Sequence, residues 1–236
     1  MKKVVLLIVV GVMCAQAALA SEYAAFTSDL VKPYGYFKQA LSLTSKKEDI
    51  EKAKTAVASL IESWGTFSAK YATDVPKPFI KLPDFSSRIK RPVEVGRKAA
   101  EFLKNGDVKQ AHMVLEEIRY LMWDLRVKSS VVSLSDKANN FHEVMEIVLD
   151  RSEHAKDGGG MLAVEERFGP WLAVAWEELA LAPASETSAP GFPVLLQDGR
   201  TSVAALRAAL RSGDRAAVKQ QGNAVKNAYK KVFFMD

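Results

Sequence analysis

Two histidine–glutamate pairs are the residues of this chain best suited to chemistry. His112 and Glu116 are four residues apart, and His142 and Glu146 repeat that spacing. Residues four apart lie on one face of an α-helix, so each pair can present an imidazole beside a carboxylate. Histidine and carboxylate groups on facing helices are the ligands with which helical bundles hold divalent metal ions.

A hairpin between the helices that carry these pairs would bring them together. If the chain turns midway between them, Glu116 and Glu146 fall at the same level, with one histidine above and the other below. Met145 would add a thioether, which is a soft ligand that favours copper. The predicted metal ligands are therefore His112, Glu116, His142, Met145 and Glu146, and the candidate ions are copper, iron and zinc.

The same residues also have a plainer interpretation. His112 lies roughly 110° around its helix from the centre of the apolar stripe. The two histidines would stand about 12 Å apart along the axis, so one shared mononuclear site is not expected. The alternatives are a two-metal or surface site, or simple helix-rim residues with Arg119 paired to a glutamate. His154, at a helix end, is expected to interact with the helix dipole.

No catalytic motif accompanies these pairs. Gly158-Gly159-Gly160 is not followed by lysine and serine or threonine, so it does not indicate a phosphate-binding loop. A nucleophile elbow and a Ser-His-Asp signature are also missing from the sequence. The tryptophans are expected to pack in the core or between bundles; they are Trp64, Trp123, Trp171 and Trp176. We therefore expect a protein that is not an enzyme.

The N-terminus has the features of a secretory signal. Lys2-Lys3 precedes an apolar run over residues 4–12, and Ala18-Leu19-Ala20 forms a small-x-small cleavage site. The prediction is a signal peptide over residues 1–20 and a periplasmic mature chain. Cys14 lies inside that signal, so disulfides and thiolate metal sites are excluded from the mature chain.

Charge and hydropathy exclude two further classes. The formal net charge is +5, and two of the positive residues belong to the signal. No long basic block occurs, so nucleic-acid binding is not expected. No second long apolar run follows the signal, so we expect no membrane span in the mature form.

Apolar residues recur with a helical period along nearly the whole mature chain, and no strand pattern is visible. Helices are predicted over residues 22–43, 47–73, 93–104 and 108–128, and over residues 135–154, 161–181, 202–211 and 216–234. Pro33 and Gly35 are expected to kink or interrupt the first helix. Proline-containing connections are expected over residues 76–87 and 182–193.

Rare and structure-breaking residue types return after 107 positions. Gly106-Asp107 corresponds to Gly213-Asp214, where glycine is expected to end one helix and aspartate to cap the next. Trp64 corresponds in the same way to Trp171, and Phe85 to Phe192. The predicted fold is all-α, with two tandem up-down four-helix bundles over residues 21–130 and 134–236. The alternative is one continuous eight-helix domain.

Short segments near the ends of both halves share a pattern. They are Gly213-Asp214 with residues 215–219, residues 225–231, and residues 106–112. These segments resemble the last turn and helix of the cytochrome b562 and cytochrome c′ group of periplasmic four-helix bundles. The resemblance implies a tandem relative of that group, whose members also pair through flat helical faces, so a homodimer is one expectation.

In b562-type proteins, haem iron is held by a methionine on the first helix and a histidine on the last. Met145 resembles that methionine, but Lys230 stands where the histidine would fall. The counterparts in the first half are Lys38 and Trp123. The c′ attachment motif is missing from the sequence, so the resemblance implies a scaffold without the haem ligand pair.

Two functional hypotheses follow from these observations. The first is a periplasmic bundle that binds a divalent or copper ion on a b562-like scaffold. The second is an accessory or interaction protein of an envelope or electron-transfer complex, with a protein partner and no small ligand.

Overall fold

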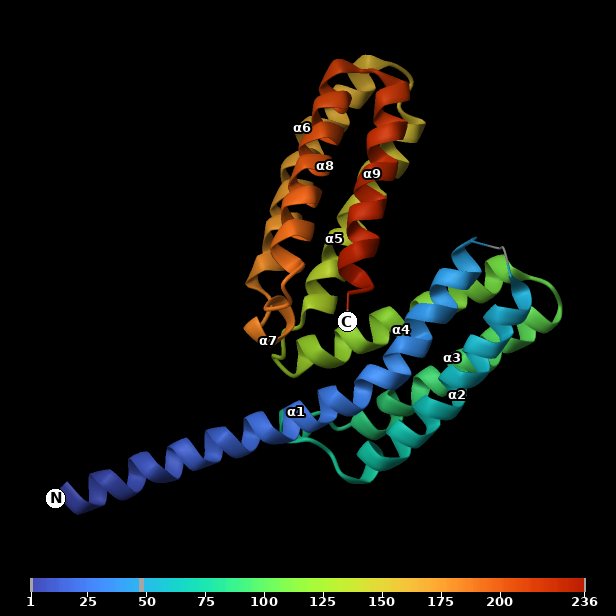
Figure 1. Cartoon of the computed structure of the whole chain (residues 1–236). Helices are drawn as coiled ribbons and strands as arrows, with labels where there is room; N and C mark the ends of the chain where they lie inside the picture. The colour runs from blue at the N-terminus through green and yellow to red at the C-terminus, as the bar shows by residue number, and fades with distance from the viewer. Residues whose placement is uncertain (1, 47–48, 236) are drawn as a thin grey trace. The chain divides into compact units, whose positions relative to one another are not determined.

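The computed structural model describes residues 2–46 and 49–235, and the side chains of residues 23–45 and 49–235. These residues form helices α1–α9 and two short 3₁₀ helices, with no strand in the part described, which confirms the all-α class (Figure 1). The chain divides into two compact units, Met1–Val131 and Val132–Asp236. Each unit is described by itself below.

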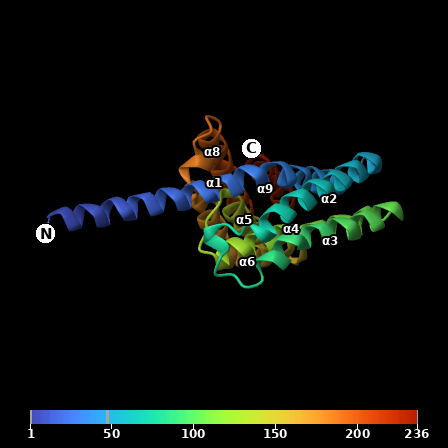
Figure 2. The same cartoon turned by 90° about the horizontal axis from the view of Figure 1, so that it is seen from below.

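Four long helices surround the core of the first unit. They are α1 (Lys2–Lys46), α2 (Ile50–Thr73), α3 (Phe85–Lys104) and α4 (Val108–Lys128), with a 3₁₀ helix at Lys77–Phe79. Each helix packs against the next, and α4 returns to pack against α1 (Figures 1 and 2). Trp64 is fully buried among them, and its indole Nε1 donates to the carbonyl oxygen of Ile89 at 3.0 Å.

The second unit has the same cyclic packing order. Its long helices are α5 (Leu134–His154), α6 (Gly158–Glu177), α8 (Phe192–Ser212) and α9 (Arg215–Phe233). The 3₁₀ helix Glu178–Leu181 and the short α7 (Ala184–Thr187) join α6 to α8. Helix α5 packs on α6 and α9, and α8 packs on α6 and α9. Buried Trp176 donates from Nε1 to the carbonyl oxygen of Leu196 at 2.8 Å.

The turns before α4 and α9 have the predicted chemistry. Gly106 and Gly213 adopt positive φ angles of 78° and 70°, a conformation that glycine tolerates best. Asp107 accepts a hydrogen bond from the backbone N–H of Gln110, and Asp214 accepts from the backbone of the first turn of α9. Both aspartates therefore cap their helices, as the sequence predicts.

Proline does not interrupt the helices in the first unit. Helix α1 continues through Pro33, and α3 begins at Phe85 rather than at residue 93, with Pro92 inside it. Proline removes one backbone donor from a helix, but buried neighbours can outweigh that loss. Pro33 and Pro92 are both buried, so packing keeps each helix continuous. Helix α8 likewise begins at Phe192, earlier than predicted.

Two helix starts also differ from the prediction. The glycines at 158–160 form the first turn of α6 instead of a separate turn, because Asp157 accepts a hydrogen bond from the Gly160 N–H. Helix α5 begins at Leu134, one residue before the predicted start, and is capped by Ser133. The Ser133 hydroxyl lies 3.1 Å from the backbone nitrogen of Asp136, which donates to it.

The predicted equivalence of Trp64 and Trp171 is wrong. Trp64 and Trp176 occupy corresponding buried positions, whereas Trp171 is 64% exposed. Their carbonyl partners, Ile89 and Leu196, do lie 107 positions apart, but Trp176 lies 112 positions after Trp64. The spacing therefore changes between the second and third helices of the two units, and this places a different tryptophan in the core.

The predicted signal peptide lies in the N-terminal part of α1. The backbone of residues 2–20 is helical and runs beyond the other helices of the first unit (Figure 1), but its side chains are outside the described set. The signal and the periplasmic location therefore stay predictions. Across the residues searched, none of the helices is long and apolar enough to cross a membrane.

Candidate functional site

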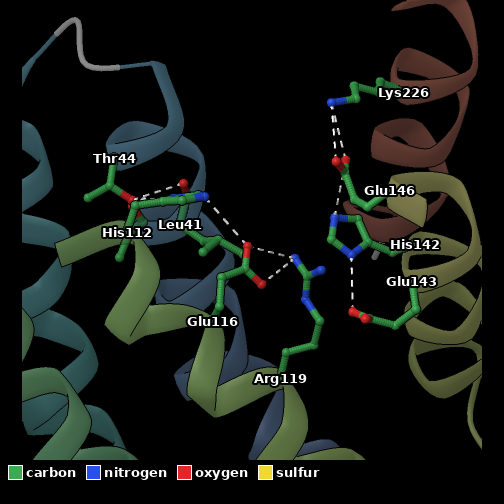
Figure 3. Close-up of polar contacts among 10 residues, drawn as sticks. Leu41, Thr44, His112, Glu116, Arg119, His142, Glu143, Glu146 and Lys226 are labelled. Carbon is green, nitrogen blue, oxygen red and sulfur yellow. Dashed lines mark hydrogen bonds and ion pairs between the residues drawn. The ribbon is translucent and has the colours of Figure 1, made fainter. Parts of the chain in front are cut away.

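His112 and Glu116 form a polar cluster on α4 together with Thr44 of α1 (Figure 3). His112 Nδ1 lies 3.0 Å from Thr44 Oγ1, and the Thr44 hydroxyl donates to the carbonyl oxygen of Ala40 at 2.9 Å. The imidazole tautomer sets which of the two groups donates in the His112–Thr44 hydrogen bond. The other ring nitrogen, Nε2, lies 3.5 Å from Glu116 Oε1.

Arg119 competes for the same carboxylate. Its Nη2 lies 3.1 Å from Glu116 Oε2, which confirms the expected pairing of Arg119 with a glutamate. The Arg119 side chain is 3% exposed, so its positive charge is poorly screened by water. A guanidinium beside Glu116 weakens the attraction of that carboxylate for a metal cation. The cluster therefore offers a cation two ligands, one of them shared with an arginine.

His142 and Glu146 lie together on α5, and their carboxylate is also shared. His142 Nε2 is 3.9 Å from Glu146 Oε1, and His142 Nδ1 is 3.6 Å from Glu143 Oε1. Lys226 of α9 reaches the same Glu146 oxygen at 3.2 Å (Figure 3). This ion pair links α9 to α5. The Lys226 ammonium also weakens the attraction of the Glu146 carboxylate for a metal cation.

Met145 lies on another face of α5. It is 1% exposed and belongs to the core, whereas the Glu146 side chain is 45% exposed. This separation leaves His142 and Glu146 without the thioether that would favour copper. His154 donates from Nδ1 to the Asp150 carbonyl oxygen at 2.8 Å in the last turn of α5. That contact confirms the predicted interaction of His154 with the helix end.

Each predicted histidine–glutamate pair is thus assembled within its own unit. The expected meeting of Glu116 with Glu146 involves helices of different units, so it stays a prediction. Among the residues that were searched, no group of three or more histidine, cysteine, aspartate or glutamate side chains is placed to hold a metal ion.

Comparison with known proteins adds no relative. The sequence matches no family model, no curated protein and no solved structure. The resemblance to cytochrome b562 therefore rests on the short motifs alone. Met145 is buried in the core, whereas Lys230, at the position of the expected histidine, is exposed on α9 and does not supply the second axial ligand of a b562-type haem.

An apolar stripe on the outer face of α6 was missed by the sequence analysis. Trp171, Val174 and Leu181 are 64%, 59% and 72% exposed. At 100° per residue, Ala163 and Pro170 fall on the same side of α6 as Val174, and both are exposed. Leu181 lies at the end of the 3₁₀ helix that follows α6, and the other residues lie on α6 itself. We call these five residues the α6 stripe: Ala163, Pro170, Trp171, Val174 and Leu181. The sequence does contain a pattern that could have revealed this stripe. Ala163, Pro170 and Val174 recur at i, i+7 and i+11, on a different face of the helix from the buried Leu172 and Ala175.

Proposed function

We propose that this chain is a non-enzymatic periplasmic protein that docks a protein partner through the α6 stripe. The observation that carries the proposal is the 64% exposure of Trp171, a large aromatic side chain at the edge of a row of exposed apolar residues. Tryptophan is enriched among the residues that dominate binding energy at protein interfaces. Exposed apolar patches on protein surfaces are a feature of protein–protein interaction sites.

The polar groups near the stripe suit the rim of an interface. Glu177 receives a bidentate contact from Arg200, with hydrogen bonds of 2.6–3.0 Å, and this pair lies beside the C-terminal half of the stripe. Arg167 lies on the same side of α6 as Val174, between Ala163 and Pro170, so it interrupts the stripe, and its guanidinium is 5.2 Å from the centre of the Phe168 ring. The Glu177–Arg200 pair forms a charged rim, which stays hydrated while an apolar centre is desolvated.

Photo-crosslinking from position 171 tests this proposal. We expect a photoreactive amino acid at Trp171 to form one discrete adduct in the cellular compartment that holds the protein, because the stripe is desolvated when the partner binds. Trp171→Ala should weaken the purified complex by about 30-fold or more while leaving stability within about 0.5 kcal/mol.

The matched control places the same photoreactive group at Asn223, an exposed position on α9. Equal labelling from positions 171 and 223, or no adduct from either, would contradict docking through the stripe. An adduct with a second copy of this chain would identify a homodimer as the partner arrangement.

Metal binding is the second candidate function, and one observation favours it. Thr44 Oγ1 lies 3.0 Å from Nδ1 of His112, and Nε2 of the same ring lies on the side of Glu116, 3.5 Å from its Oε1. A hydrogen bond to the non-ligating nitrogen is the usual way in which proteins orient a metal-binding histidine. His112 and Glu116 would hold a copper or zinc ion, with solvent completing the coordination.

Removal of His112 tests the metal hypothesis. We expect His112→Ala to weaken Zn²⁺ or Cu²⁺ binding at least tenfold in calorimetric titration, because it deletes one of two protein ligands, and Thr44→Val to weaken it less. His154→Ala is the matched control, since His154 contacts Asp150 of its own helix in the last turn of α5. Unchanged metal affinity in His112→Ala would exclude this cluster as the site.

We also infer that the two units descend from one duplicated helical module with an offset of 107 residues, forming four-helix bundles over residues 21–130 and 134–236. Supporting this are the positive-φ glycines Gly106 and Gly213, and the indole hydrogen bonds to Ile89 and Leu196. The carbonyl partners of the indoles and the positive-φ glycines are each 107 residues apart. The donor tryptophans, Trp64 and Trp176, are not, which indicates that the second helix of one unit changed after the duplication.

A further inference from the structure

A polar cleft lies between α1 and α2 of the first unit. Its volume is about 390 Å³. It is lined by Asp29, Lys32, Pro33, Tyr36, Ser59, Glu62, Ser63, Thr66, Phe67 and Lys70. Ligand clefts in proteins typically measure about 300–1,000 Å³, so a small molecule fits here.

Small side chains open this cleft. Helix α2 presents Ser59, Ser63 and Thr66 towards α1, at the spacing of one helix face. A bundle seam normally carries larger apolar residues at such positions, and these fill the space between two helices. The floor is apolar, because Pro33 and Phe67 are buried beneath it. The cleft thus combines an apolar floor with a hydroxyl-lined wall.

One end of the cleft is closed by groups that are already paired. Asp29 accepts hydrogen bonds from Lys70 Nζ at 2.6 Å and from the Tyr71 hydroxyl at 2.7 Å. These hydrogen bonds, that from Lys70 first, hold the pKa of Asp29 below its usual value of 3.8. Asp29 is therefore ionised and satisfied at neutral pH, and Lys70 is engaged with it.

The remaining polar groups of the cleft are available to a ligand. Within the part of the chain that the structure describes, the Lys32 ammonium on α1 and the Glu62 carboxylate on α2 make no ion pair. Over the same residues, the side-chain hydroxyls of Tyr36, Ser59 and Ser63 make no hydrogen bond. One positive group, one negative group and three hydroxyls therefore line a single cleft.

We propose that this cleft binds a zwitterion of amino-acid or dipeptide size. Lys32 receives the ligand carboxylate, Glu62 receives its ammonium group, and the apolar part rests on Pro33 and Phe67. Lys32 and Glu62 have opposite charges, and Asp29 and Lys70 neutralise one another, so the cleft favours neither a net anion nor a net cation. Three hydroxyls can donate to or accept from the remaining polar atoms of the ligand.

Calorimetric titration of the purified full chain tests this proposal. The probes are leucine, phenylalanine, alanyl-leucine and alanyl-phenylalanine. We expect saturable binding of at least one probe, weakened about tenfold or more by Lys32→Ala and by Glu62→Ala, because each variant removes a charge-assisted contact. Lys98→Ala and Glu101→Ala on the exposed face of α3 are the matched controls and should leave affinity unchanged.

Chemical variants of the probe separate the two charges. N-acetylation removes the positive charge of the probe, so it should weaken binding to the parent protein. The acetylated probe should then bind the Glu62→Ala variant and the parent with the same affinity. Ser63→Leu should fill the cleft and remove binding while the melting temperature stays close to that of the parent. Failure of all four probes to bind at about 10 mM, or an affinity that Lys32→Ala and Glu62→Ala leave unchanged, would overturn the proposal.

Discussion

Gly199→Ala is expected to destabilise the second unit by about 3–5 kcal/mol, the range found when a buried tryptophan is lost. Helix α8 has glycine at position 199 because the Trp176 ring lies directly on its backbone. A Cβ atom there would fall 1.6 Å from Trp176 Cζ2. The ring cannot simply move aside, because it donates to Leu196 and packs edge-on against Phe141 with ring centroids 4.7 Å apart.

Urea unfolding followed by circular dichroism measures this effect. Gly65→Ala in α2 is the control, because its Cβ would meet no atom within 4 Å. Alanine is a better helix former than glycine, so that change should stabilise the first unit by about 0.5–1 kcal/mol. The effect of Gly96→Ala on the free energy of unfolding should lie between those of Gly199→Ala and Gly65→Ala, since its Cβ would meet the flexible Ile61 side chain at 2.8 Å. A Gly199→Ala protein as stable as the parent would show that Trp176 does not require this glycine.

Gly169→Ala is expected to destabilise the same unit by about 2–4 kcal/mol, through a buried carboxylate instead of a ring. The Glu165 side chain is 5% exposed, and its Oε1 accepts from Arg207 Nη2 at 2.9 Å and from Arg211 Nη1 at 2.6 Å. The new Cβ would lie 1.9 Å from Glu165 Oε2. Expelling the carboxylate would break the ion pairs that link α6 to α8.

A double-mutant cycle separates this mechanism from a general effect of alanine in α6. Glu165→Ala removes the clashing group, so Gly169→Ala should cost far less in the Glu165→Ala background than in the parent. Unfolding free energies of the parent, both single variants and the double variant give the coupling. Strictly additive costs would mean that Gly169 does not act through Glu165.

Local features of this fold could be predicted from neighbouring residues alone. The glycine–aspartate turns at Gly106 and Gly213 form as expected, because their conformation and capping depend on only a few adjacent residues. The contacts of His112 with Glu116 and of Arg119 with Glu116 also form, since helical spacing brings them together. His154 meets the carbonyl of its own helix for the same reason.

Other predictions failed where distant residues decide the outcome. Pro33 and Pro92 have strong local preferences against helix interiors, yet both lie buried inside continuous helices. Trp171 and Trp176 are both apolar by type. Only the position of α8 explains why Trp176 is covered by Gly199 and Trp171 is left in solvent. Met145 was grouped with the metal ligands by sequence distance, but packing places it in the core.

The amino-acid sequence by itself determined the helical class, the aspartate caps of α4 and α9, and the histidine–glutamate pairs, because each depends on contacts within about one or two helical turns. Only the tertiary structure decided which tryptophans are buried, that Glu146 is shared with Lys226, and where the α1–α2 cleft opens. Those features join side chains that lie far apart in the chain. Their burial and pairing follow from how the helices pack, and no local spacing in the sequence contains that information.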